Sequence, residues 1–353
     1  MNFNFIRVIR PYSYIRVGFS EAMLNEFRQD LVSGEWVLFS TGRRSRPGET
    51  REVRRFLQPR ESCPFEDPEK SGNKVVETYF NKDKTDWFVK IIKNKFPAVA
   101  EGEAGDARLA GPFKTIEGRG MHEVAVFRDH ERDFYDFSDG EIAEIFRIYR
   151  KRYLAMMDSG SRKYTLIFHN HGVQAGATVS HPHSQIISIP VLPPDVKRSI
   201  DGSEDFYRRH GEKIYDVMLE WEMKEKKRIV YENGSFVAFC PFVSKTEYEV
   251  RIFPKESQAR FEKMPEELFA DLGDVFRVIF RKIGRALDKP DYNFFIHTSP
   301  INLPAQEDHE FYSWHIEILL KMATVGAFEL ASGMEINVID PDGAAKLFRE
   351  TKI

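Results

Sequence analysis

Hydrophobic and polar positions along the chain follow one pattern twice. Segment 121–130 (MHEVAVFRDH) alternates as a half-buried strand does, and 138–156 then has the spacing of an amphipathic helix. The same succession returns at 247–257 (EYEVRIFPKES) and 265–287. We therefore expect a strand, a polar loop and a helix in each half of the chain.

Local signals support the two predicted helices. Ser138 and Glu141 form a capping-box pattern at the start of the first helix, and Pro265 suits the first turn of the second. The apolar positions at helical spacing are Ile142, Ile145, Phe146 and Tyr149 in the first helix, and Leu268, Leu272, Val275 and Ile279 in the second.

The parallel continues beyond the helices. YTLIFHNHG at 164–172 matches YNFFIHTSP at 292–300, and HPHSQIISI at 181–189 roughly matches WHIEILLKM at 314–322. Order, spacing and matched histidines favour duplication of one unit. We predict an α+β fold of two such units, with antiparallel strands, helices on one face, and halves that complete one sheet system.

The predicted organisation has three parts. Residues 1–22 are an N-terminal extension, 23–195 the first unit and 196–353 the second, with a charged helix in the linker near 195–230. Arginines interrupt the apolar runs of 1–22 before a signal-peptide core forms. A strand, an arm or an upstream extension all remain open for this segment.

Composition narrows the class of protein. The 353-residue chain is 30% charged with a net charge of −3, which argues against general affinity for nucleic acid or anionic membranes. Cys63 and Cys240 are too few for a disulfide framework, and no segment approaches a membrane span. We expect a cytoplasmic protein.

The segment between 164 and 189 carries the candidate chemistry. Gly172 and Gly176 let the backbone approach a bound phosphate. His181, His183 and Gln185 then share one face of the following strand because side chains repeat every two residues. This arrangement suits phosphoryl transfer with a neutral imidazole as nucleophile. The other two histidines of the segment, His169 and His171, are expected to serve packing.

The segment fits the pattern N-x-G-x-x-x-G-x-[ST]-x-x-H-P-H-x-Q, which resembles the active-site signature of galactose-1-phosphate uridylyltransferases. These enzymes form the nucleotidyltransferase branch of the histidine-triad superfamily. The resemblance runs from about Arg28 to the C-terminus. The stretches that carry it outside the signature are 28–47, SCPF at 62–65, NKFPAV at 94–99, MHEVAVFRDH at 121–130 and 314–337.

The resemblance implies roles for single residues. His183 would be the nucleophile that becomes uridylylated, and Gln185 would hold a non-bridging phosphoryl oxygen. The family usually has an acidic residue where Lys95 stands, which leaves uridine and adenine both open. The implied substrate contacts are Arg43, Arg46, Asn170, Gly176 and Thr178 for phosphates, Asn94 and Lys95 for the nucleoside, and Phe328 and Glu329 for the hexose.

The resemblance also implies a structural zinc site. Cys63, His130 and His181 match three family ligands, and Glu66 stands where the second cysteine of the knuckle is expected. Zinc accepts carboxylate as well as thiolate and imidazole, so we predict retained zinc. The alternative is a knuckle without metal, in which Glu66 is solvated.

For a second metal, only two family ligands remain. His297 and His315 are present, but Ser313 replaces a further histidine. Two histidines are too few to assign a site.

We therefore expect a transferase of galactose metabolism that moves UMP from UDP-glucose to a hexose 1-phosphate by a ping-pong mechanism. A phosphorylase of ADP-glucose or of a dinucleoside polyphosphate, using the same histidine, is the alternative. A non-catalytic nucleotide- or metal-binding protein is the contrasting class. Gln185 in place of a third histidine favours transfer over hydrolysis. The resemblance also implies a homodimer whose active sites are completed across the interface.

Overall fold

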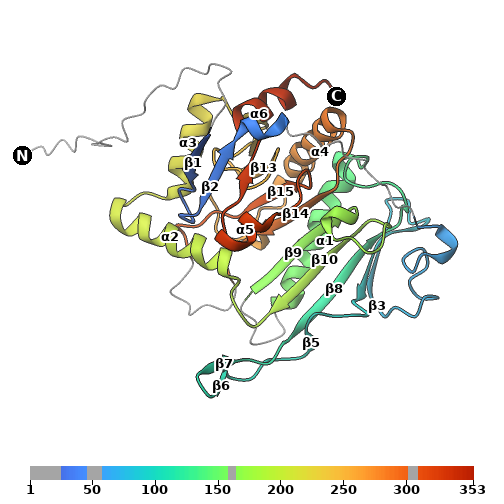
Figure 1. The fold of residues 1–353 in the computed structure, drawn as a ribbon. Coiled ribbons are helices and arrows are strands. Elements are labelled where there is room, and N and C mark those ends of the chain that lie inside the picture. Colours follow the sequence, from blue (N-terminus) through green and yellow to red (C-terminus); the bar gives the residue numbers. More distant parts are fainter. Residues whose placement is uncertain (1–24, 46–57, 158–163, 301–308) are drawn as a thin grey trace, which may run out of the picture.

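The computed structural model describes residues 25–45, 58–157, 164–300 and 309–353, and one large sheet organises it (Figure 1). Neighbouring strands lie in the order β11-β12-β13-β15-β14-β9-β10-β8-β4-β3, all antiparallel, and β5 adds to β8 in parallel. The strands are β3 (Val75–Phe80), β4 (Trp87–Lys93), β5 (Ala100–Glu101), β8 (Arg119–Phe127), β9 (Tyr164–His171), β10 (His183–Ile189), β11 (Ile229–Glu232), β12 (Phe236–Phe239), β13 (Val250–Pro254), β14 (Tyr292–His297) and β15 (His315–Leu320).

The predicted duplication is visible in this sheet. The first unit runs β8, α1 (Asp139–Met157), β9 and β10, and the second runs β13, α4 (Leu268–Leu287), β14 and β15. The two units join where β9 pairs with β14, with Asn170 opposite Asn293. The α+β fold with one sheet system built by both halves is therefore confirmed.

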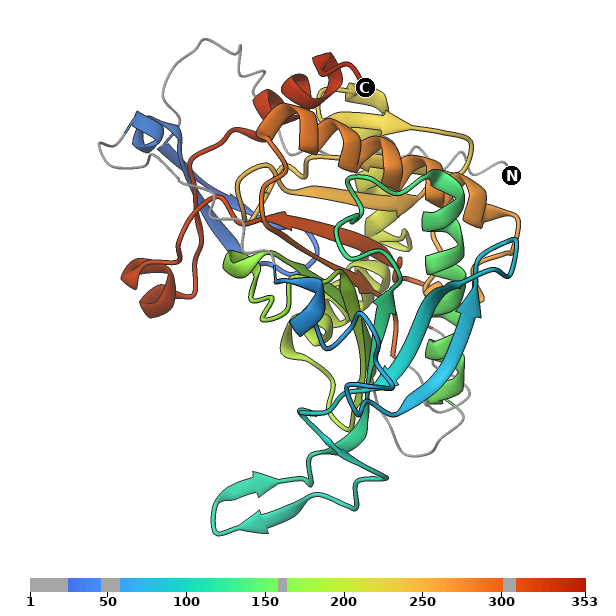
Figure 2. The same ribbon diagram turned by 90° about the vertical axis from the view of Figure 1, so that its right-hand side faces the viewer.

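Helices α1 and α4 lie side by side on one face of the sheet (Figure 2). The backbones approach closely at Gly273, where a Cβ atom would lie 2.3 Å from the Asp139 carbonyl oxygen. The expected capping box is present: the Ser138 N–H donates to Glu141 Oε2 (2.8 Å) and the Glu141 N–H donates to Ser138 Oγ (3.3 Å). The expectation for the second helix was wrong: α4 begins at Leu268 without a side-chain cap, so Pro265 lies before its first turn.

The linker holds two helices where we expected one. Helix α2 (Pro194–His210) ends at Gly211, whose φ of 69° is left-handed, and α3 (Ile214–Glu225) starts a new axis. Both pack on the other face of the second unit's sheet, away from α4. Strand β12 is therefore buried on both sides: Phe236 belongs to the core under α4 and Val237 to the core under α2 and α3.

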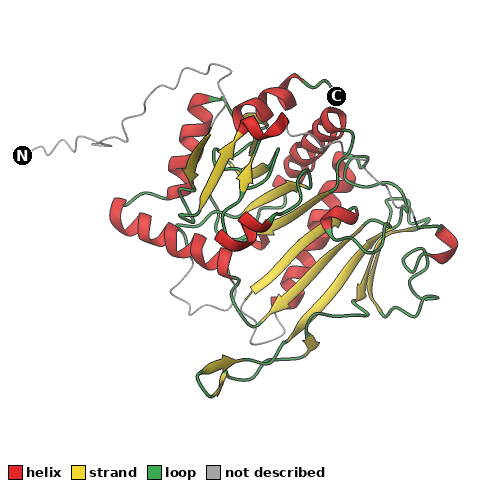
Figure 3. Cartoon of the chain, viewed as in Figure 1, coloured by secondary structure: helices red, strands yellow, loops and turns green. Residues whose placement is uncertain are grey.

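The remaining elements lie outside the large sheet (Figure 3). A small sheet joins the chain ends, with β16 parallel to β2. Helix α5 projects from the body near this sheet, and a hairpin extends from β5 and β8 (Figures 1 and 2). Their bounds are β1 (Asn25–Gln29), β2 (Trp36–Ser40), β6 (Arg108–Ala110), β7 (Phe113–Thr115), α5 (Ala327–Ser332), β16 (Ile336–Asn337) and α6 (Pro341–Glu350); the short 3₁₀ helices are Thr41–Ser45, Arg60–Ser62, Val173–Ala175 and Phe261–Lys263.

Two sequence predictions concern parts without a described structure. The extension 1–22 and Arg46 lie outside the described residues. Within the described ranges, every helix is too short or too polar to cross a bilayer.

Candidate active site and metal group

Strand β10 places the two central candidate side chains on one face of the sheet. Ser184, which lies between them in sequence, hydrogen-bonds the Tyr149 hydroxyl of α1, so His183 and Gln185 point to the opposite face. In the antiparallel pair with β8, His183 lies opposite Val126 and Gln185 opposite Val124.

The position of the His183 ring shows which of its nitrogens carries the proton. Its Nδ1 lies 2.9 Å from the carbonyl oxygen of His181, so Nδ1–H donates and Nε2 keeps its lone pair. Nε2 has no hydrogen-bond partner among the described residues. The Phe65 ring packs edge-on at 5.0 Å between centroids. Burial lowers the pKa of His183, despite the opposing effect of the bond to the His181 carbonyl, so the ring is neutral near pH 7.

Gln185 is held by a side chain from β8. Its Oε1 lies 2.8 Å from Nε2 of His122, and Nδ1 of His122 accepts a hydrogen bond from the Ala98 N–H (3.1 Å). A ring that accepts at Nδ1 carries its proton on Nε2, so His122 donates to Gln185. The Gln185 NH₂ group then remains available as a donor. Asn94 Nδ2 lies 3.2 Å from the same imidazole nitrogen. Since that nitrogen carries the proton, the Asn94 contact places two donors side by side and is not a hydrogen bond, so Gln185 Oε1 is the acceptor for His122.

The glycine loop after β9 is shaped by the second unit. Gly172 has a φ of +84°, and a Cβ atom there would lie 2.0 Å from the Asp291 carboxyl group. That carboxyl accepts from the Gln174 N–H at 2.8 Å. Asn293 donates to Asn170 Oδ1 (2.8 Å) and to the Ala175 carbonyl (2.9 Å). Strand β14 thus fixes the shape of the loop and the direction of the Asn170 amide.

The other implied substrate residues divide into two groups. Gly176, Thr178 and Lys95 are exposed, in the glycine loop and in the 94–98 segment that His122 contacts. Arg43 follows β2, and Phe328 with Glu329 lies on α5, so these three belong to the small sheet and its projecting helix. Within the described chain, no hydrogen bond joins this second group to the side chains of β10.

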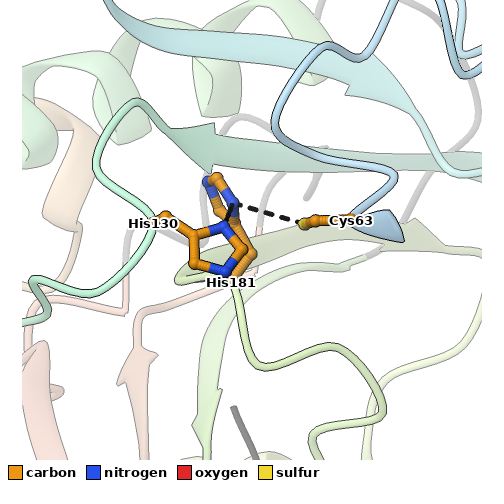
Figure 4. A group of neighbouring side chains, drawn as sticks. All are labelled: Cys63, His130 and His181. Carbon is orange, nitrogen blue, oxygen red and sulfur yellow. Dashed lines mark hydrogen bonds between the residues drawn. The ribbon is translucent and has the colours of Figure 1, made fainter. Parts of the chain in front are cut away.

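The predicted metal ligands converge (Figure 4). The ligand atoms of Cys63, His130 and His181 lie within 4.8 Å of one another, and all three residues are buried. Nδ1 of His181 is 3.1 Å from Nδ1 of His130 and 3.5 Å from Cys63 Sγ. Glu66 Oε2 lies 3.2 Å from Nδ1 of His130 and is a buried carboxylate oxygen without a hydrogen-bond donor.

The ring protons of His130 and His181 are placed so that both rings could bind a cation. His181 Nε2 lies 2.6 Å from the Phe127 carbonyl, and His130 Nε2 lies 2.8 Å from the Gln58 carbonyl, so both rings donate from Nε2. Burial also lowers the pKa of His181 to about 4. Two Nδ1 lone pairs therefore face each other beside a thiol and a carboxylate. Zinc uses such a donor set, and the carbonyl contacts fix the ligating tautomers.

Glu66 is oriented toward the same point by two arginines. Its other oxygen, Oε1, accepts from Arg128 Nη1 (3.1 Å) and Arg60 Nη1 (3.4 Å). Burial raises the pKa of this carboxyl, but the Arg128 hydrogen bond and both charges outweigh burial and lower it. Glu66 is thus ionised and half-buried beside Cys63, His130 and His181, in a state that suits a carboxylate ligand of zinc.

His169 and His171 take no part in this group. His169 is 1% exposed, stacks on Phe294 and contacts Ser184 Oγ through Nδ1 at 2.9 Å. His171 Nε2 lies 3.3 Å from the Asp133 carboxylate. Both residues belong to β9 and are two positions apart, so strand alternation directs their side chains to the same packed face of the sheet.

The second unit carries a related group at the start of β15. His315 Nδ1 donates to the Ser313 carbonyl (3.0 Å), as His183 does to His181, and Glu317 stands where Gln185 stands. Both Glu317 oxygens already have partners, Arg251 Nε at 3.1 Å and His297 Nε2 at 3.4 Å. The guanidinium supplies the positive charge here, so we assign no metal to this group.

Sequence reasoning missed His122 and Asn293, which hold the candidate amides, and Glu317 beside the two remaining histidines. For Glu317 a signal existed, because the spacing H-x-E on a strand places both side chains on one face. For His122 and Asn293 the partners lie 63 and 123 residues away, so no local pattern could reveal them.

Two family models match the chain. Residues 18–193 match the galactose-1-phosphate uridyl transferase N-terminal domain, and residues 199–340 match its C-terminal domain. ADP-glucose phosphorylase of Arabidopsis thaliana is 30% identical over 334 residues, which cover 93% of each chain. Galactose-1-phosphate uridylyltransferase of Thermotoga maritima is 26% identical over 339 residues, covering 93% of this chain and 99% of the relative.

Solved structures of the same two kinds of enzyme are similar to this chain over most of its length. The crystal structure of the Arabidopsis ADP-glucose phosphorylase with bound ADP-glucose has a TM-score of 0.78 at 28% identity and covers 94% of this chain and 100% of its own. A uridylyltransferase structure has a TM-score of 0.69 at 26% identity, covering 92% and 98%.

Proposed function

Because the chain belongs to the galactose-1-phosphate uridyl transferase family, we propose that it transfers a nucleoside monophosphate from a nucleotide sugar through a covalent intermediate on His183. The observation that carries this proposal is the ring orientation of His183. Its Nδ1–H is bound to the His181 carbonyl, and its Nε2 lone pair has no partner among the described residues. A neutral imidazole held in this way is a competent nucleophile toward phosphorus.

The reaction has two displacements. Nε2 of His183 attacks the α-phosphorus of the nucleotide sugar, and the bond between that phosphorus and the bridging oxygen breaks. The sugar 1-phosphate leaves with the electron pair. An acceptor phosphate oxygen then attacks the same phosphorus and restores the neutral imidazole. The Gln185 NH₂ group donates to a non-bridging oxygen, where charge develops in both steps.

We propose ADP-glucose as the donor and inorganic phosphate as the acceptor. The Arabidopsis phosphorylase is more similar in sequence than the Thermotoga uridylyltransferase, at 30% against 26% identity. Lys95 in place of the family's usual acidic residue also argues against the uridine contact that such a residue makes. The second candidate is transfer of UMP from UDP-glucose to galactose 1-phosphate, which our sequence interpretation placed first and which the family description favours.

The test is covalent labelling. The purified protein is incubated with ADP-glucose or UDP-glucose, and intact and peptide masses are measured. We expect addition of AMP to His183 with ADP-glucose, release of glucose 1-phosphate, and formation of ADP when phosphate is added. Labelling by UDP-glucose alone would favour the second candidate. Absence of label with both donors would refute nucleotidyl transfer from these sugars.

The variant His183→Ala is the control for the labelled position. His169→Ala is unsuitable for this purpose because its ring fills the core. His171→Ala is the better match, since that ring is only half-buried and lies on the neighbouring strand. We expect labelling to be lost in the first variant and retained in the second.

Zinc and assembly complete the proposal. We propose that a structural zinc ion is held by Cys63, Glu66, His130 and His181. The ion would fix His181, whose carbonyl oxygen orients the His183 ring. Arg43, Phe328 and Glu329 would serve a substrate bound by a partner subunit of a homodimer, since they belong to the small sheet and α5 and not to the β10 region.

A further inference from the structure

The His122 imidazole connects two parts of the candidate site. His122 and Gln185 are diagonal neighbours on one face of the β8–β10 pair, where Gln185 is opposite Val124 and His122 is opposite Ile187. The same face carries His183 two residues before Gln185. His122 therefore lies in line with the nucleophile but is separated from it by the Gln185 side chain.

Two hydrogen bonds hold the His122 ring, and a third holds its main chain. The Ala98 N–H donates to Nδ1 at 3.1 Å, and Nε2–H donates to Gln185 Oε1 at 2.8 Å. The His122 carbonyl accepts from the Asn94 N–H at 2.9 Å. The 94–98 segment is thus tied to both the main chain and the ring of His122.

The direction of the hydrogen bond to Gln185 matters chemically. A side-chain amide can turn by about 180°, which exchanges its oxygen for its nitrogen at nearly the same place. Only one of these orientations offers an N–H to an anionic phosphoryl oxygen. With its NH₂ group turned toward His122, Gln185 would place a donor against the imidazole Nε2–H and an oxygen toward the anion. Both contacts would be repulsive.

We infer, on the basis of the proposed function, that His122 is a positioning residue that selects the donating orientation of the Gln185 amide and couples it to the 94–98 segment. His122 does not touch the reacting atoms and acts through Gln185. Its effect therefore falls on the transfer step, where the Gln185 N–H meets developing charge. Its bond to Ala98 affects nucleoside binding separately.

Three substitutions separate these two contacts. The Oδ1 atom of Asn lies where Nδ1 of His lies, so His122→Asn keeps the acceptor for Ala98 but does not reach Gln185. His122→Gln reaches Gln185 with an N–H donor. His122→Met has nearly the length and shape of the Gln variant without a donor, so it is the matched control.

The experiment measures single-turnover labelling of His183 by quenched mass spectrometry across a range of ADP-glucose and UDP-glucose concentrations. For His122→Asn we expect the maximal labelling rate to fall roughly 10- to 100-fold, the size of effect that a misplaced catalytic contact produces. The half-saturating donor concentration should change less than about threefold. His122→Met should lower the rate and raise that concentration, while His122→Gln should recover most of the rate.

A second background tests the route through Gln185. In Gln185→Ala, we expect His122→Asn to lower the labelling rate by less than about twofold further, since the group it positions is gone. A purely structural role predicts the same loss in both backgrounds.

The outcomes are distinct. If the wild-type protein is labelled and His122→Asn is labelled at the same maximal rate, the positioning role is wrong and the proposed function stands. The role is also wrong if Gln and Met at position 122 give equal rates, a comparison that holds even where His122→Asn folds poorly. If the wild type takes no label from either donor, both the proposed function and this role fail.

Discussion

Nδ1 of His130 and Nδ1 of His181 lie 3.1 Å apart, although Nε2 of each ring donates to a main-chain carbonyl. Two Nδ1 lone pairs repel each other at that distance unless a cation lies between them. The nearby thiol of Cys63 and the buried Glu66 oxygen are further electron-pair donors. The arrangement leads to a prediction about metal content.

We predict about one zinc ion per chain, held by this group, and a large loss of stability on chelation because the ligands otherwise repel. Glu66→Ala should lower zinc affinity at least roughly tenfold, and Glu66→Cys should retain the metal. The measurements are elemental analysis and competition with a chromogenic chelator. Glu61→Ala, an exposed carboxylate nearby, is the control. Equal zinc content in Glu66→Ala and wild type would remove Glu66 from the ligand set.

Protonation of His315 should lower the free energy of unfolding when the pH is lowered. Burial lowers the pKa of this ring to about 4, outweighing the opposing hydrogen bond to Glu317. The folded state therefore binds a proton less readily than the unfolded chain, whose histidines titrate near pH 6.5. This contribution is fully present above about pH 6.5 and is lost as the pH falls toward 4, by up to about 3 kcal/mol.

Urea unfolding at pH 7.5 and 5.0 checks this sign. His315→Asn can keep the donor to the Ser313 carbonyl but has no group that titrates in this range, so its stability should depend less on pH than that of the wild type. The exposed His210→Asn serves as the control. A parallel pH dependence in His315→Asn and wild type would contradict the prediction.

Gly172→Ala should disrupt the glycine loop for two separate reasons. Gly172 has φ 84° and ψ 162°, a backbone region that costs a residue with a Cβ atom about 1–3 kcal/mol. The added Cβ would also overlap the Asp291 carboxyl at 2.0 Å. Gly176 has the same φ of +84° but nothing within 4 Å of an added Cβ. In thermal unfolding, Gly172→Ala should thus be clearly less stable than Gly176→Ala. Equal losses would mean that Asp291 moves aside without cost.

Breaking the buried pair between α1 and β8 should be costly. Arg152 Nε and Nη2 contact the two Glu123 oxygens at 2.9 and 2.8 Å, and Glu123 is 1% exposed. Arg152→Met leaves a buried carboxylate without its partner, so we expect a loss of about 3–5 kcal/mol in free energy of unfolding. Lys151→Met, which removes an exposed partner of Glu77, should change it by less than about 1 kcal/mol.

The double variant Arg152→Met/Glu123→Leu separates the causes of that loss. If the unpaired charge dominates, the second substitution should recover most of the stability of the single variant. No recovery would mean that the aliphatic stem of the arginine contributes most of the stabilisation.

Much of the fold could be predicted from periodicity. The two helices, the capping box of α1 and the antiparallel strands follow from patterns within about 20 residues, and all of them are present in the structure. The expected first turn at Pro265 was wrong, since α4 begins at Leu268. The prediction of one linker helix was wrong. A polar helix can contain a glycine, but the left-handed φ of Gly211 ends α2 at that point. The packing of α2 and α3 on the second face of the sheet was not foreseen either.

The sequence by itself indicated the nucleophile candidate, because spacing on one strand decides which side chains share a face, and it indicated the candidate metal ligands through a family pattern. His183 and Gln185 needed only alternation, and Cys63, His130 and His181 needed only a family pattern. The tertiary structure alone decided how the candidate amides point. His122 reaches Gln185 from β8, and Asn293 reaches Asn170 from the other unit. These hydrogen bonds depend on the register of the strands and on how the two halves join. Both are set by contacts between residues that are far apart in the sequence.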